Sequence, residues 1–437
     1  MKKFNSFLIF AVITALFFLT QSCKKNVDDP TPNQSEQGFE TLQVPENFNW
    51  LTSTPLKIDL KFVDQNQDAV VTSFEVYSKF PDGVKFMTGT SKSDGSFAKM
   101  YQIANYRSSF FVVIPGQDPV EVVFGETEVN EISAYEAKAT ITVVNPSLKS
   151  VAAETYEYYP AEGKYGSLCF EDNWPSEADY DFNDVVIDYN VIATLNDDFL
   201  VTKINMQLFL RASGANNHNG FGISFKHSWS NDGPYPDIAT VTVNGTPVTA
   251  EATDYPSFII IEDIETWQPT YNSFMNQAFV APTEFNVEIV LNTPASNWWE
   301  LSLPLQNPFI IVDQERGREI HLPWHLPTSL ADPSYVGKGV DASDPYAFDP
   351  GNFKAGNMVI GYYTYMTEEG FPWAMDIYMD SDDEDLFLYP VEFTDIANAY
   401  TSFEGWVEES DPWEWYLPEY RVVDSIYSKI PTPPYGE

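Results

Sequence analysis

The stretch Leu56-Lys57-Ile58-Asp59-Leu60-Lys61-Phe62-Val63 alternates between apolar and charged residues. Successive side chains of a β-strand point to opposite faces, so this alternation predicts a strand with one buried and one solvated face. Phe74-Glu75-Val76-Tyr77 repeats the pattern, and turn signals follow at Pro81-Asp82-Gly83 and Ser93-Asp94-Gly95. Short strands with close turns predict a small β-sandwich domain over residues 46–147, in which no pattern indicates chemistry.

The rest of the chain, residues 148–437, is also predicted to be mainly β-structure. Apolar or alternating runs predict strands at 185–193, 203–210, 222–227, 239–243, 258–261, 286–291 and 358–363. A helix is predicted to begin near Asp395, because Ile396, Tyr400, Phe403 and Val407 then share one face. The expected fold is therefore all-β, with the small sandwich followed by a larger β-sandwich or jelly-roll-like region that carries one or two short helices.

The N-terminus has the features of an export signal. Lys2 and Lys3 precede an apolar run, Phe7 to Leu19, which is too short to span a bilayer. The following Leu19-Thr20-Gln21-Ser22-Cys23 resembles a bacterial lipobox, which implies cleavage before Cys23 and acylation of that residue. We expect residues 1–22 to be a lipoprotein signal peptide and residues 23–45 a flexible tether. Plain secretion with an ordinary Cys23 is the alternative.

Composition limits the partners and the type of scaffold. The 437 residues include 23 Lys plus Arg and 64 Asp plus Glu, which gives a formal charge of −41. Such a chain lacks the basic surface that nucleic acids require, and it would not adhere unaided to an anionic membrane. Only two Cys are present, and lipidation of Cys23 would leave Cys169 without a partner in the chain. A multi-disulfide or Cys-rich zinc scaffold is thus excluded.

One acidic loop has the pattern of a metal site. Asp179, Asp181, Asn183 and Asp184 form the motif D-x-D-x-N-D immediately before the apolar run that begins at Val185. Ca²⁺ takes six to eight oxygen ligands, and alternate side chains of a tight loop can converge on one ion. The motif is not an EF-hand, because Asp184 occupies the position of the required Gly. We expect these four residues to bind Ca²⁺.

Three further acids lie near the motif, and their distances along the chain limit which of them can reach the same ion. An extended strand would separate Asp184 from Asp188 by about 13 Å, so one ion cannot bind both directly. Glu171 and Asp172 can join the ion only if the turn at Trp174-Pro175 folds back. The alternative to a metal is a hydrogen-bonded turn, although clustered carboxylates without a cation would repel one another.

Weaker patterns have simpler interpretations. His321 and His325 could form a zinc pair but are expected to be loop residues, since Pro323 prevents one helical face. The acid run 380–385 is expected to be a solvated loop, with a second calcium site as the alternative. Trp298-Trp299 and the stretch 413–416 are expected to lie in the core, although exposed rings could stack on sugars. No nucleophile elbow or phosphate loop is present.

The stretch Leu168 to Tyr189, with its FED-W-P and DYDFNDVV-DY elements, resembles the LruC domain family of bacterial surface lipoproteins. Supporting segments lie at 220–223, 319–323, 341–343, 372–375 and 389–406, so the resemblance spans roughly residues 160–420. The segment 45–50 also looks like the start of an accessory domain common in Bacteroidetes members. The resemblance implies a cell-envelope protein and supplies no catalytic residues to carry over.

These observations together predict a lipid-anchored envelope protein, held in the outer membrane through Cys23 and possessing a calcium-stabilised β domain. We expect it to be non-catalytic and to act in binding or assembly at the cell surface, with a protein or a glycan as its partner and no nucleic acid. One alternative is a glycan-binding or glycan-processing surface protein. Another is a structural component of a surface fibre, built by exchange of a strand between subunits.

Overall fold

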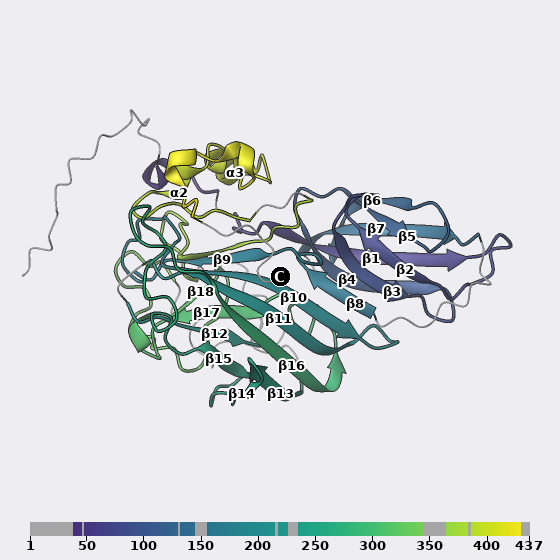
Figure 1. The fold of residues 1–437 in the computed structure, drawn as a ribbon, viewed down its shortest axis with the longest axis horizontal. Helices are drawn as coiled ribbons and strands as arrows, with labels where there is room; N and C mark the ends of the chain where they lie inside the picture. Colours follow the sequence, from purple (N-terminus) through teal and green to yellow (C-terminus); the bar gives the residue numbers. More distant parts are fainter. Residues whose placement is uncertain are drawn as a thin grey trace, which may run out of the picture. The chain divides into compact units, whose positions relative to one another are not determined.

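The computed structural model describes residues 38–429, apart from gaps at 46–47, 130–131, 145–154, 215–216, 226–234, 344–363 and 383–385. Strands make up nearly all of the regular structure in these residues (Figure 1). They form a large mixed sheet and a smaller four-stranded sheet. The all-β fold class predicted from the sequence is therefore confirmed.

The described N-terminal part contains the strands β1 (Ser53–Val63), β2 (Ser73–Tyr77), β3 (Lys85–Thr90), β4 (Ser96–Ala104), β5 (Ser109–Val113), β6 (Val120–Val129) and β7 (Ile132–Thr142). Strand β1 pairs antiparallel with β4 and parallel with β7. The apolar residues of β1 that were predicted to share a face are all buried, and Phe62 stacks on Phe74 of β2 with ring centroids 4.9 Å apart. The alternating pattern thus predicted both the strand and its buried face correctly.

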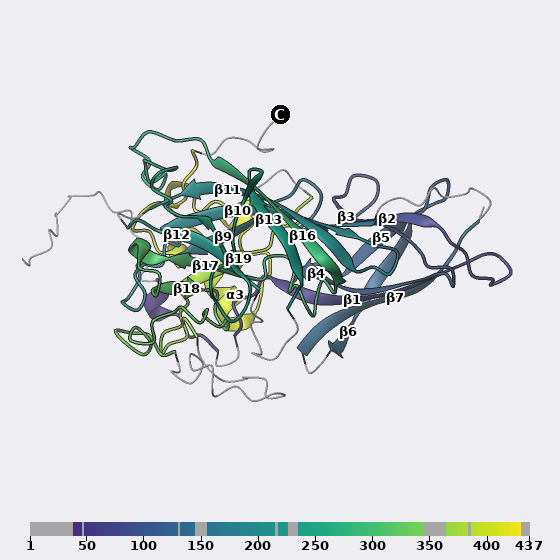
Figure 2. The same ribbon diagram turned by 90° about the horizontal axis from the view of Figure 1, so that it is seen from below.

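The C-terminal part contains β8 (Thr155–Tyr159), β9 (Gly166–Phe170), β10 (Val185–Leu195), β11 (Val201–Ala212), β12 (Gly220–Ser224), β13 (Ile238–Val243), β14 (Thr246–Pro247), β15 (Ser257–Ile261), β16 (Thr283–Ala295), β17 (Asn307–Ile311), β18 (Glu319–His321) and β19 (Ala374–Ile377). The large sheet has the order β14-β13-β16-β11-β10-β8-β3-β2-β5-β6-β7-β1-β4, with β9 also paired to β10 and β19 paired to β9. Strands β10, β11 and β16 lie side by side in both ribbon views (Figures 1 and 2). The smaller sheet has the order β15-β12-β17-β18. The strand predicted at 358–363 lies outside the described residues.

The large sheet crosses the domain boundary that was predicted at residues 147 and 148. Strand β3 pairs with β8 through Met87 opposite Glu157 and Thr88 opposite Tyr156. The residues from Gly38 onward form one compact unit. The two predicted domains therefore share a sheet.

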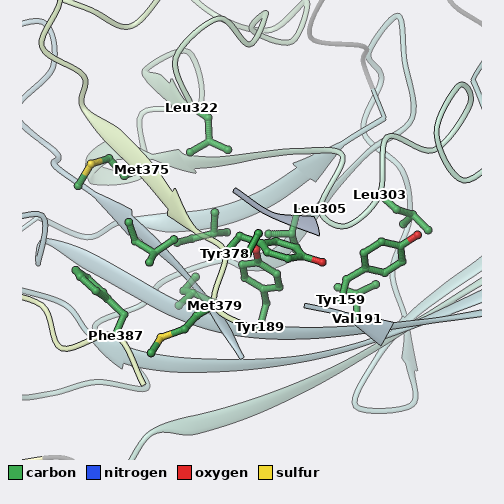
Figure 3. Packing of buried hydrophobic residues seen from close by; sticks show 14 of the residues in the cluster. Tyr159, Tyr189, Val191, Leu303, Leu305, Leu322, Met375, Tyr378, Met379 and Phe387 are labelled. Atoms are coloured by element: carbon green, nitrogen blue, oxygen red, sulfur yellow. The ribbon is translucent and has the colours of Figure 1, made fainter. Parts of the chain in front are cut away.

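Side chains from the large sheet and from the loops of the C-terminal part form the main core. Figure 3 shows Tyr189 and Val191 of β10 among Leu303, Leu305 and Tyr378, and all five side chains are buried. The hydroxyl of Tyr189 donates a hydrogen bond of 2.7 Å to Asp376 Oδ1. Strand β10 is buried almost throughout and most of its side chains are apolar, while its buried polar residues Asp188 and Asn190 both have hydrogen-bond partners.

The helix predicted near Asp395 is present but divided. Asp395 caps α2 (Ile396–Ala399) by accepting a hydrogen bond from the backbone N–H of Ala397, and α3 (Phe403–Glu409) follows. The two helices are separated because Tyr400 has an extended backbone conformation. All four residues predicted to share the apolar face are buried nevertheless.

The expectation that the tether extends to residue 45 is wrong for its last part. Residues Phe39–Thr41 form a 3-10 helix, and the Phe39 ring is fully buried. It stacks on Tyr180 with ring centroids 4.3 Å apart and packs edge-on against Phe371 at 4.8 Å. A polar spacer composition predicted a free chain, but Phe39 and Leu42 are buried and the backbone N–H of Gln43 donates a hydrogen bond to Glu408, so this segment is docked on the body.

The signal peptide predicted at residues 1–22 and the lipidation site at Cys23 lie outside the described residues. Within the described part, no helix combines the length and the apolar character needed to cross a membrane.

Candidate metal centre

A long loop between β9 and β10 carries the acidic motif. The two strands pair antiparallel, with Phe170 opposite Val185, so the loop leaves and re-enters the sheet at neighbouring positions. This pairing places Glu171, the first loop residue, beside Asp184, the last. The pairing of β9 with β10 therefore brings Glu171 and Asp172 back to the motif, which the sequence alone could not establish.

Three carboxylates of this loop converge. One side-chain oxygen each from Glu171, Asp179 and Asp181 lies within 4.8 Å of the other two. Glu171 and Asp181 are buried, whereas Asp179 is exposed and opens the group to solvent. The Glu171 Oε1 atom accepts a hydrogen bond of 2.6 Å from the backbone N–H of Phe182, and Oε2 is buried without a hydrogen-bond partner. An unpaired buried carboxylate oxygen is costly unless a donor or a cation meets it.

Two further carboxylates flank the three. Asp184 Oδ2 accepts a hydrogen bond of 2.8 Å from the backbone N–H of Asp172, and Asp172 Oδ2 accepts one of 2.7 Å from Asn219 Nδ2. Both acids are buried. Asn219 lies just before β12, so sequence reasoning about the motif did not find it. The five carboxylates of residues 171, 172, 179, 181 and 184 are called the acidic cluster below.

A segment more than 200 residues away closes the acidic cluster from the other side. The backbone N–H of Phe393 donates a hydrogen bond of 2.7 Å to Asp181 Oδ2, and that of Ile396 donates one of 2.9 Å to the carbonyl of Tyr180. Glu392 brings a sixth carboxylate, whose Oε2 atom is buried without a hydrogen-bond partner. Nothing near Glu392 in the sequence indicates this role, because only the tertiary fold brings it to the loop.

Asn183 anchors the loop. Its Nδ2 atom donates a hydrogen bond of 3.2 Å to the carbonyl of Pro390, and its own carbonyl accepts one of 3.0 Å from the backbone N–H of Gly214. A Cβ atom at residue 214 would lie 2.2 Å from Asn183 Oδ1, so this close approach requires glycine. The Oδ1 atom is buried without a hydrogen-bond partner. Asn183 is thus held from both sides, and its backbone N–H donates a hydrogen bond of 3.2 Å to Asp181 Oδ1.

Burial and mutual repulsion disfavour negative charge in the acidic cluster. Burial, followed by the charges of Asp181, Asp184 and Asp179, raises the pKa of Glu171 well above the ordinary glutamate value. The pKa values of Asp181 and Asp184 are also raised well above the ordinary aspartate value, mainly by burial and then by neighbouring carboxylates. Burial raises the pKa of Glu392 to about 7. The cluster must therefore take up protons or a cation to reduce its charge.

Asp188 is separate from the acidic cluster, as its distance along the strand predicted. It accepts hydrogen bonds of 3.0 Å from Arg211 Nη1 and 2.6 Å from Ser167 Oγ. Asp188 and Arg211 are both buried. This ion pair is internal to the sheet and needs no metal.

The histidine pair is not a metal site. The Nε2 atom of His321 lies 2.9 Å from Glu319 Oε2, and its Nδ1 atom lies 2.6 Å from Asn307 Oδ1. Both ring nitrogens thus have protein partners, and no lone pair remains for zinc. His325 is half-buried, and the loss of solvent around its ring lowers its pKa to about 4. His321 lies in β18 instead of the expected loop.

The other weak patterns have structural roles. The acid run is not a solvated loop at its start, as was expected, because Asp380 is buried and accepts a hydrogen bond of 3.1 Å from Arg107 Nε, a protein cation. Residues 383–385 lie outside the described part. Trp415 is fully buried, whereas Trp299 is 52% exposed. The core interpretation thus holds for the later aromatic cluster and not for Trp299.

Comparisons with known proteins agree with the fold. Residues 200–416 match the model of a family described as "Domain of unknown function (DUF4842)". No curated protein matches the chain. The fold resembles that of a crystal structure described as a "Putative lipoprotein" from Bacteroides ovatus, with a TM-score of 0.54 and 16% sequence identity. That similarity covers 81% of this chain and 98% of the other, and at this identity it shows a shared fold alone.

Two other solved structures have much lower similarity. One is the dioxygenase domain of a dioxygenase carbohydrate-binding protein fusion from Streptomyces sp. SirexAA-E, with a TM-score of 0.16, 12% identity and coverage of 26% of this chain and 99% of that one. The other is BcpA, the major pilin subunit of Bacillus cereus, with a TM-score of 0.15, 12% identity and coverage of 59% and 63%. TM-scores this low support no conclusion about this chain.

Proposed function

We propose that the protein is a lipid-anchored component of the bacterial cell envelope, whose β domain is stabilised by Ca²⁺ bound at the acidic cluster. The lipid is carried by Cys23 and holds the chain in the outer membrane. The protein has no catalytic role in this proposal and acts by binding or assembly at the cell surface. The LruC resemblance supports the envelope location, and so does the fold shared with a protein described as a lipoprotein.

The convergence of Glu171, Asp179 and Asp181 is the observation that carries the calcium proposal. Two oxygens bound to one Ca²⁺ at about 2.4 Å can lie at most about 4.8 Å apart, and the three acids meet this limit. The unpaired Oε2 atom of Glu171 provides a ligand that has no other partner in the described structure. One divalent ion would also offset much of the repulsion that raises the pKa values in the cluster.

The chemistry of the donors favours Ca²⁺ over other metals. The candidate ligands are carboxylate and amide oxygens, which suit hard cations, and the acidic cluster contains neither Cys nor His. Mg²⁺ retains several waters and uses few protein ligands, whereas many carboxylates surround this position. Asp172, Asp184 and Asn183 either complete the coordination or hold the three converging acids in place.

Strand exchange in a surface fibre has less support in the described residues. The large sheet ends at β14, which has two residues, at β4 and, on its branch, at β19. The outer edge of β4 is partly covered, because Met100 O accepts a hydrogen bond of 2.7 Å from Asn297 and Gln102 O accepts one of 2.8 Å from Tyr378. A donor strand would have to displace these contacts.

Calcium titration of the full-length protein, purified in detergent, tests the proposal. We expect the melting temperature to be higher in Ca²⁺ than in chelator and calorimetry to show saturable binding. Glu171→Gln should lose most of both effects. Glu177→Gln is the matched control, because Glu177 is an exposed acid of the same loop outside the converging group. Equal melting temperatures of the wild type in Ca²⁺ and chelator would contradict the proposal.

The anchor is tested separately in cells. Wild-type protein should incorporate an alkyne-labelled fatty acid and sediment with the outer membrane. The Cys23→Ser variant should do neither. Incorporation that is unchanged in Cys23→Ser would disprove acylation at this residue.

A further inference from the structure

A groove of about 720 Å³ lies on the face of the large sheet formed by β8, β10, β11 and β16. Cross-strand pairs share a face of a sheet, so the register shows which side chains are aligned across it. Two such rows line the groove: Tyr158, Ile192 and Asn205, and Tyr156, Thr194 and Lys203. The volume is that of an ordinary small-molecule site and is large enough for several sugar rings.

The charge of the groove differs from that of the whole molecule. Lys203 and Glu162 are the charged residues of its lining, so their charges cancel. The chain as a whole carries −41. A cationic peptide would find many more acidic surfaces elsewhere, and an anion would meet a single Lys. A neutral lining therefore matches an uncharged ligand.

The remaining side chains offer hydrogen bonds and an aromatic surface. Asn205 and Gln207 present amides and Thr194 presents a hydroxyl, which can both donate and accept hydrogen bonds. The Thr202 hydroxyl donates to the carbonyl of Thr194 at 3.1 Å and can still accept one. The half-buried Tyr156 ring lies beside Tyr158, with centroids 6.4 Å apart and planes inclined by 37°. Sugars have this combination of hydroxyl groups around an apolar ring face, which packs against aromatic rings.

We propose that this groove binds an uncharged oligosaccharide. The sugar would lie across the strands, with one ring against Tyr156 and its hydroxyls bonded to Asn205 and the neighbouring amide and hydroxyl side chains. This assigns glycan recognition to the sheet face and not to the tryptophan stretches considered from the sequence. The proposal names a partner class for the surface function proposed above. None of the groove residues belongs to the acidic cluster, so it does not depend on calcium.

The test measures binding of cellohexaose, xylohexaose, mannohexaose and maltohexaose to the full-length protein in detergent, by saturation-transfer NMR and calorimetry. We expect at least one of them to bind, and Tyr156→Ala and Asn205→Ala each to weaken that binding at least tenfold. Thr194→Trp should block it by filling the groove. Trp299→Ala is the matched control, because this exposed ring lies outside the groove and should leave the affinity unchanged.

Melting temperatures of all variants in Ca²⁺ verify that the fold is retained, and Glu171→Gln checks the independence of the two sites. Retained sugar binding in Glu171→Gln agrees with separate sites, whatever the outcome of the calcium titration. Absence of binding by all four sugars at about 5 mM, a concentration at which even a weak complex is detected, would overturn the proposal. Binding lost in Trp299→Ala but retained in the groove variants would overturn it as well.

Discussion

The Oδ2 atom of Asp181 accepts a hydrogen bond of 2.7 Å from the backbone N–H of Phe393, which lies 212 positions later in the chain. The acidic loop is thereby tied to the segment that leads into α2. The bond from the N–H of Ile396 to the carbonyl of Tyr180 adds a second link between them. A loss of order in this loop should therefore also loosen the packing of the C-terminal helices.

Replacing Asp181 should have effects of opposite sign with and without calcium. In Ca²⁺, Asp181→Asn removes a charged ligand, and we expect the variant to melt at a lower temperature than the wild type. In chelator, the same change removes one buried negative charge from a repelling cluster, so the variant should melt at a higher temperature. Thermal unfolding under both conditions measures this reversal. The same order of stability in both would show that no cation is bound there.

Calcium stabilisation should increase with pH. The folded, metal-free protein holds Glu171, Asp181 and Asp184 with raised pKa values, so it binds more protons than the unfolded chain. The stability that these groups contribute is present at low pH and is lost as the pH rises through their raised pKa values. The neighbouring Glu392, whose pKa is raised to about 7, acts in the same direction. Ca²⁺ replaces these protons.

The difference in melting temperature between Ca²⁺ and chelator should consequently grow from pH 5 to pH 8. This difference isolates the acidic cluster from other titrating groups, such as His325. Calorimetry in buffers of different ionisation enthalpy should show protons released on binding. A pH-independent difference, or no proton release, would argue that the carboxylates are already ionised without the metal.

Truncating Phe39 should destabilise the protein strongly. The ring is fully buried between Tyr180 and Phe371, and Phe→Ala at such sites costs about 3–5 kcal/mol. Urea unfolding of Phe39→Ala measures the cost. Gln43→Ala is the control from the same segment, since its side chain is exposed and its backbone bond to Glu408 is retained. Similar stabilities of the two variants would mean that this segment does not dock.

The buried pair of Arg211 and Asp188 should matter far more than an exposed pair. Arg211→Met leaves a buried carboxylate without its cation, which typically costs about 3–5 kcal/mol. Lys57 and Glu136 form an ion pair of 2.8 Å at the surface, and Lys57→Met should leave the free energy of unfolding nearly unchanged. Chemical denaturation of both variants compares them directly. Comparable losses would contradict the assignment of Asp188 to the core.

Thiol labelling should separate the two cysteines. Cys169 is fully buried, and burial raises its pKa, so it should not react in the native protein at pH 8. If Cys23 is acylated, the native protein takes up no label and the unfolded protein takes up one. Mass spectrometry gives these numbers. One label on the native protein would point to a free Cys23.

The sequence was most informative where a pattern depends on neighbouring residues. Alternation from Leu56 to Phe62 predicted β1 and its buried face, and the acids of residues 179–184 were recognisable because one loop carries them. Glu392 and Asn219 could not be predicted, since they reach the cluster only through the tertiary fold. The docking of Phe39 was missed because a single aromatic residue in a polar segment has no periodicity to reveal it.

The position of Phe39 has a mechanical consequence. Cys23 precedes it by 16 residues, and a fully stretched chain of that length reaches about 55 Å. With the lipid in place, as we propose, this is the farthest that the aromatic pocket can stand from the bilayer. Tension on the anchor would arrive first at the Phe39–Tyr180 stack, one residue from Asp181. If Ca²⁺ orders the loop as we propose, the ion would then also determine the force that the anchored segment withstands before Phe39 leaves the core.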